Sequence, residues 1–145
     1  MADRTLTIRW VADDFVLVFD HTDALDDREW DTFVDALVDR PAGPMGVRIL
    51  VYNAGGGPNA AQRARFDRRL RGRPTRIAVI CTSLFPRAII KAFHLMGFLH
   101  VTAFSPDQEE GAFRHLRLSA AEIASLREEL AKIRGGSRPQ PAAGA

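Results

Sequence analysis

Hydrophobic and polar positions change their period along the chain, and these changes mark the expected elements. Apolar residues alternate with polar ones over 5–10, which is typical of a strand with one buried face. Residues 15–19 are apolar throughout and predict a central strand buried on both faces. Because a tight turn at 12–14 separates the two strands, we expect them to pair as a hairpin.

A helix follows this hairpin. Asp26 and Glu29 have the three-residue spacing of a capping box, which is a signal for a helix start. The proline-rich segment 40–44 ends the helix. Apolar residues at helical spacing define its buried face, namely Trp30, Phe33, Val34, Leu37 and Val38.

The next strand and helix enclose a glycine-rich loop. Residues 47–52 form a short β-branched run, which predicts a buried strand that ends at Asn53. Asn59 is the expected N-cap of the following helix. Between them lie Ala54, Gly55, Gly56, Gly57 and Pro58. Open α/β sheets bind their ligands at the carboxyl ends of strands, so this loop is a candidate binding site.

The second half repeats the alternation of strand and helix. We expect strands at 76–83 and 100–104, with a helix between them that is capped by Ser83 and ends at Gly97. A short helix at 107–116 follows, and Ser119 with Glu122 caps a final helix. The order β-β-α-β-α-β-α-β-α plus a terminal helix predicts an α/β fold. Its five-stranded mixed sheet would be mostly parallel, with right-handed crossovers and helices packed around it.

Composition adds limits to this fold. The 145 residues, of which 46% are hydrophobic and 26% charged, predict one globular domain over 1–134, followed by a disordered Gly/Pro/Ala-rich tail at 135–145. The single cysteine, Cys81, excludes an internal disulfide and is expected in the core. No leader sequence or apolar run of about 20 residues is visible, so we expect a cytoplasmic protein without a membrane span.

The segment 86–112 resembles part of the STAS domain, the fold of bacterial anti-sigma-factor antagonists and of the cytoplasmic ends of some anion transporters. In both, a helix ends at a glycine, a strand follows, and a short helix opens with acidic residues and an alanine. Here these are Gly97, 101–104, Glu109, Glu110 and Ala112. The resemblance extends over roughly 5–117. It implies a non-enzymatic regulatory or scaffolding domain that binds a protein partner, such as a signalling protein.

The chain departs from that family where regulatory STAS domains are phosphorylated. Those domains carry a Ser or Thr at the start of the helix after this strand. Here the strand ends at Asn53, the helix starts near Asn59, and no Ser or Thr lies between Val47 and Arg73. The resemblance therefore implies partner binding without the usual phospho-switch.

The glycine loop has an alternative interpretation as a site for an anion, a lipid or another small molecule. Backbone amides at a helix N-terminus attract anions. However, the loop has neither the lysine of a P-loop nor the spacing of a dinucleotide-binding motif. We therefore favour a conformational or interaction loop, and we expect no cofactor.

Arginines crowd the helix that follows the loop. A helical wheel directs Arg65, Arg68 and Arg69 away from the core, and they join Arg63 as candidate partner-binding residues. The simpler interpretation is solvent-exposed ion pairs, since Asp67 lies four residues from both Arg63 and Arg71. No aromatic residues are interleaved for base stacking, so we expect no nucleic-acid partner. The net charge of only +2 agrees with this.

Catalysis has little support in the sequence. Ser83 and His21 could share the sheet edge with a carboxylate, but Ser83 lacks the G-x-S-x-G elbow of a hydrolase. We expect Ser83 to act as a helix cap or a partner contact instead. An open sheet edge makes a homodimer plausible, although nothing in the sequence locates its interface.

Overall fold

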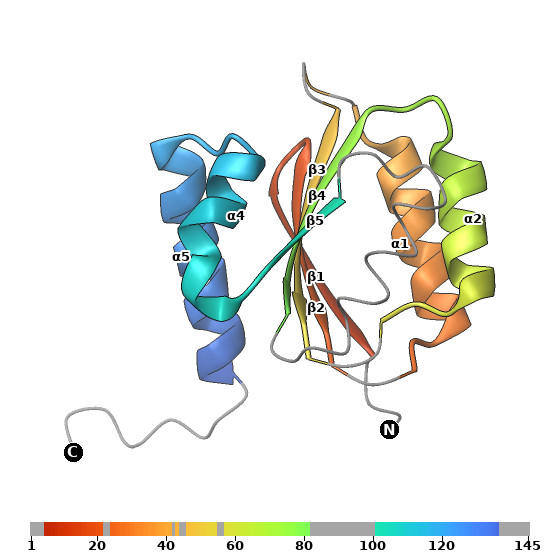
Figure 1. The fold of residues 1–145 in the computed structure, drawn as a ribbon, viewed down its shortest axis with the longest axis horizontal. Helices are drawn as coiled ribbons and strands as arrows, with labels where there is room; N and C mark the ends of the chain where they lie inside the picture. The colour runs from red at the N-terminus through yellow and green to blue at the C-terminus, as the bar shows by residue number, and fades with distance from the viewer. Residues whose placement is uncertain are drawn as a thin grey trace.

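The protein is a three-layer α/β sandwich in which helices cover both faces of one sheet (Figure 1). The structure, a computed structural model, describes residues 5–21, 24–41, 43, 46–54, 57–81 and 101–136. The predicted helix between Ser83 and Gly97, together with both chain termini, lies outside these residues.

The sheet has five strands, which lie in the order in which they occur in the chain. β1 (Leu6–Ala12) and β2 (Phe15–Asp20) form the predicted antiparallel hairpin. β3 (Val47–Asn53), β4 (Thr75–Cys81) and β5 (Val101–Phe104) continue the sheet in parallel with β2. The predicted fold class, a mixed and mostly parallel five-stranded α/β sheet, is confirmed and is consistent with a STAS-like fold.

Helices α1 (Asp27–Asp39) and α2 (Ala60–Leu70) cover one face of the sheet. Helices α4 (Glu109–His115) and α5 (Ala120–Gly136) cover the other face. The helix predicted over 107–116 is divided, because a 3-10 turn, η1 (Pro106–Gln108), precedes α4. α5 extends to Gly136, two residues beyond the expected end of the domain. None of the described helices is long and apolar enough to span a membrane.

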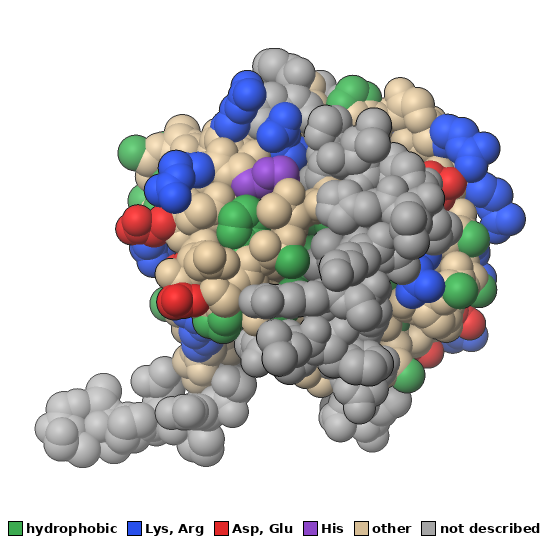
Figure 2. All heavy atoms as spheres, viewed as in Figure 1, with side chains coloured by type: hydrophobic (Ala, Val, Ile, Leu, Met, Phe, Trp, Pro, Cys, Tyr) green, Lys and Arg blue, Asp and Glu red, His purple; other side chains and the backbone are tan. Residues whose placement is uncertain are grey.

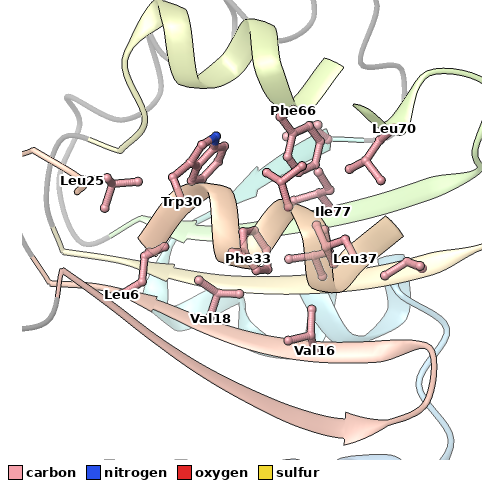
Figure 3. Close-up of a cluster of buried hydrophobic side chains, with 14 of the residues drawn as sticks. Leu6, Val16, Val18, Leu25, Trp30, Phe33, Leu37, Phe66, Leu70 and Ile77 are labelled. Atoms are coloured by element: carbon pink, nitrogen blue, oxygen red, sulfur yellow. The ribbon is translucent and has the colours of Figure 1, made fainter. Parts of the chain in front are cut away.

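Two hydrophobic cores lie on opposite faces of the sheet, and β2 contributes to both. Val16 and Val18 point toward α1 and α2, whereas Phe15 and Leu17 point toward α4 and α5. Burial on both faces explains why residues 15–19 carry no polar position. In the core under α1 and α2, Trp30 and Phe66 approach each other across the two helices (Figure 3).

Candidate functional site

The carboxyl ends of β2, β3 and β4 meet at one edge of the sheet. Their register places Asp20 beside Asn53 and Asn53 beside Cys81. The Asn53 side-chain amide donates a 2.7 Å hydrogen bond to the Asp20 carboxylate, and both residues are buried. Asn53, which was predicted as a partner- or ligand-binding residue, therefore joins two strand ends from inside the protein. The prediction that Cys81 is a core residue is confirmed.

The N-terminus of α2 is fixed by a buried glutamine. Asn59 caps the helix as predicted, with its side chain accepting from the Gln62 amide at 2.8 Å and the Gln62 side chain accepting from the Asn59 amide at 2.9 Å. The Gln62 side-chain amide also donates to the Leu25 carbonyl and to Asp27. The Trp30 indole donates to the Gln62 carbonyl at 2.8 Å. Gln62 thus connects α2 to the start of α1.

Sequence reasoning missed this role of Gln62, although a signal was present. Asn59 and Gln62 have the three-residue spacing of a capping box, as Asp26 and Glu29 do. That spacing would have identified the glutamine as a helix-start residue. It would not have indicated that Gln62 is fully buried, since that depends on the packing of α1 over α2.

The part of the glycine loop that the structure describes is held in place. Arg63 donates a 2.8 Å hydrogen bond to the Pro58 carbonyl, so one of the four candidate arginines supports the loop. Gly57 has φ of +77°, a conformation that a side chain disfavours. The other predicted residues of this region, Gly55, Gly56 and Ser83, lie outside the described residues.

An apolar cavity of about 80 Å³ lies between the sheet and helices α1 and α2. Its wall extends from the middle of the sheet, at Ile49 and Ile77, to the strand ends and the start of α2. The residues at that end are Asp20, Asn53, Leu25, Trp30, Gly57 and Pro58. Figure 3 shows Leu6, Leu25 and Trp30 together at one end of the surrounding hydrophobic cluster. The predicted strand-end site thus contains a cavity lined mainly by carbon.

Two of the four arginines of α2 are paired with acidic residues of α1. Arg65 lies 2.9 Å from Asp27 and 3.2 Å from Asp31, and Arg69 lies 2.8 Å from Asp35. Figure 2 shows basic and acidic groups intermingled on the side of the molecule that carries these helices. A ladder of ion pairs therefore connects the two helices, whereas the sequence had indicated only the pairs of Asp67 with Arg63 and Arg71.

The other charged residues of α2 have no ion pair with α1 among the described residues. Asp67 accepts from Arg71 at 2.8 Å, as predicted, whereas Arg63 donates to the Pro58 carbonyl of the loop. Arg68 has no ion pair with any residue that the structure describes. It borders a surface groove beside Val34, where Arg65 and Arg69 also lie. Arg68 is thus a candidate arginine whose charge no described residue neutralises in an ion pair.

A buried arginine on β3 forms a second network of polar contacts, in addition to the one around Gln62. Arg48 is 6% exposed and forms ion pairs with Glu122 at the start of α5 and with Asp14 in the hairpin turn. The pKa of Glu122 is lowered, chiefly by the hydrogen bond from Arg48. The pKa of Arg48 is raised, chiefly by the same bond. Sequence reasoning missed this network, although a charged residue inside the apolar run 47–52 was visible.

At the same end of the sheet as the glycine loop, Tyr52 lies on the face covered by α4 and α5. Its hydroxyl donates a 2.6 Å hydrogen bond to Glu109. Burial, followed by this hydrogen bond, raises the pKa of the Tyr52 phenol above its usual range. The Phe19 ring stacks on Tyr52, and the His21 ring stacks on Phe19. The His21 side chain, which was considered together with Ser83 for catalysis, also shares a 2.6 Å hydrogen bond with Thr7.

The described residues hold no cluster of three or more histidine, cysteine, aspartate or glutamate side chains suited to a metal ion. Asp20 and Asn53, which these residues bring to the strand ends, are hydrogen-bonded to each other. Comparison with protein-family models, with curated proteins and with solved structures gives no match.

Proposed function

We propose that this chain is a non-enzymatic regulatory or scaffolding domain that binds a protein partner, as its resemblance to STAS domains implies. The observation that carries the proposal is the apolar cavity at the strand ends. The partner would insert one aliphatic side chain between the sheet and the start of α2. Asp20 and Asn53 would form one wall of that contact.

The size of the cavity favours a side chain over a whole metabolite. Pockets for drug-sized ligands measure about 300–1,000 Å³, and an engineered apolar cavity of about 150 Å³ accepts benzene. The cavity here is about 80 Å³, which suits an aliphatic side chain or a short alkyl group. Single anchors of this kind, buried in a pocket, contribute much of the affinity of protein interfaces.

A cavity-filling substitution tests the proposal. Val18 lines the cavity on β2, and Val18→Ile adds one methylene group to its wall. Val38→Ile is the matched control, because it makes the same change in the same hydrophobic cluster but away from the cavity. A partner captured from native cells with the full chain should bind the Val18→Ile variant about tenfold or more weakly than the control. Equal binding by wild type and both variants would contradict the proposed site.

A small-molecule function is the second candidate, and the apolar lining of the cavity favours a ligand with an alkyl group. The same lining gives no support to the anion site that the glycine loop suggested. Native mass spectrometry of freshly purified protein distinguishes the two functions. A retained small molecule that Val18→Ile displaces and Val38→Ile keeps would replace the partner proposal with this one.

A further inference from the structure

The outer edge of β1 presents backbone groups that β2 does not use. β1 is the first strand of the sheet, so β2 pairs with only one of its edges. The His21 amide donates to the Thr5 carbonyl at 3.1 Å, which fixes the phase of hydrogen bonding along the hairpin. Since successive residues of an antiparallel strand direct these groups to opposite edges, those of Leu6, Ile8 and Trp10 point outward.

Within the part of the chain that the structure describes, these outward groups have almost no hydrogen-bond partners. No described residue forms a hydrogen bond with the outward amide or carbonyl of Leu6 or Trp10. The Ile8 carbonyl accepts one hydrogen bond, at 3.1 Å, from the side chain of Arg9, which is 47% exposed. β1 offers seven residues without a proline, whereas β5, at the other edge of the described sheet, has four. Long edges of this kind are templates for pairing with another strand.

We propose that β1 pairs antiparallel with β1 of a second copy of this chain, about a two-fold axis through Ile8. The Ile8 amide of each copy then donates to the Ile8 carbonyl of the other. Leu6 lies opposite Trp10 of the second copy, and Thr7 lies opposite Arg9. An axis through Arg9 would instead place like charges opposite each other, which is unfavourable.

The surroundings of β1 suit this pairing. Ile8 and Trp10 are half-buried on the face that α1 covers, so the dimer would bring apolar side chains together across the strands. α1 lies along β1, because Glu29 accepts from Thr5 and the Arg40 guanidinium lies 3.8 Å from the centre of the Trp10 ring. A two-fold pairing uses the open β1 edge of both copies, so association through β1 stops at a dimer.

Sedimentation of the full chain over a wide concentration range tests the proposal. We expect a reversible dimer for wild type. Ile8→Pro replaces the outward amide with the proline ring and removes no amide that points to β2, so it should weaken association about tenfold or more. Ile8→Ala, the matched control, keeps that amide and should keep the dimer. A wild-type chain that stays monomeric at every concentration, or equal association of the Pro and Ala variants, would overturn the proposal.

Hydrogen exchange of wild type provides a second measurement that does not depend on the folding of Ile8→Pro. The amides of Leu6, Ile8 and Trp10 should be protected at high protein concentration and exchange faster on dilution. The Thr7 amide, which points to β2, should be equally protected at both concentrations. Exchange at the three outward amides that does not change with concentration would also refute the dimer.

Discussion

Replacing Arg48 with methionine should reveal how strongly one buried charge holds α5 to the sheet. Arg48 lies on β3 and contacts Glu122 on α5, Asp14 in the hairpin turn and the Leu116 carbonyl after α4. Methionine preserves much of the apolar stem but removes every one of these hydrogen bonds. The two carboxylates would then lose the ion-pair partner that they share.

The expected loss in the free energy of unfolding follows from the burial of Arg48 and its two carboxylate partners. Removing one partner of a buried ion pair destabilises a protein by about 3–5 kcal/mol, because the other charge stays buried. The Arg48 side chain is 8% exposed, but those of Asp14 and Glu122 are each 21% exposed and keep some contact with water. We therefore expect Arg48→Met to lower the free energy of unfolding by about 3 kcal/mol, the lower end of that range.

Urea denaturation followed by circular dichroism at neutral pH measures this loss. Arg71→Met is the control, because its ion pair with Asp67 is exposed and should contribute less than about 0.5 kcal/mol. A loss for Arg48→Met below about 1 kcal/mol, within the range of an exposed pair, would refute the reasoning.

Acid provides an independent check on the same pair. The pKa of Glu122 is lower in the folded protein than in the unfolded chain, mainly through its bond to Arg48. Its contribution is therefore complete above the unfolded pKa of about 4.3 and is lost as the pH falls through the folded pKa. The stability difference between wild type and Arg48→Met should shrink as the pH is lowered through this window.

Three further predictions concern single positions. Gly46→Ala should destabilise the fold far more than Gly72→Ala, measured by urea denaturation, although both glycines have positive φ. A Cβ at Gly46 would lie 1.9 Å from a backbone carbonyl oxygen, whereas at Gly72 it meets open space and the loss should be about 1 kcal/mol. Tyr52 is the only tyrosine, so ultraviolet absorbance should show its phenol ionising well above the usual pKa of about 10 in folded protein and near it in urea. The stabilisation that accompanies this shift should be complete below the unfolded pKa and disappear as the pH rises through the folded one. Gln62→Leu should lower the free energy of unfolding by about 2 kcal/mol, because it leaves the Asn59 and Leu25 backbone groups without their partner.

The sheet was predictable because its strands are marked by local patterns. The unbroken apolar run at 15–19 indicated burial on both faces, and β2 does contribute to both cores. The helix starts at Asp26 and Asn59 were also predictable, since a cap depends on residues three positions apart. Periodicity and capping depend on neighbours in the sequence, so they can be recognised before the fold is known.

The two networks of polar contacts were not predictable in the same way, because their partners are distant in the sequence. Arg48 and Glu122 are 74 positions apart, and the Gln62 side chain meets Leu25 across 37 positions. Only the order and crossing of the elements bring such pairs together. A single sequence could indicate that a charged or amide group would be buried, but it could not identify the partner.

The ion pairs between α1 and α2 limit which arginines of α2 can contact a partner. Its arginines were predicted as candidate partner-binding residues, but Arg65 and Arg69 are paired with acidic residues of α1. Reversing either charge would replace an attraction between the helices with a repulsion, so weaker partner binding by such a variant would not distinguish a lost contact from a displaced helix. Arg68 has no such pair among the described residues, and its charge can be reversed without breaking the ladder. An electrostatic contribution of this face to partner binding should therefore be attributed to Arg68, and the apolar cavity should supply the rest.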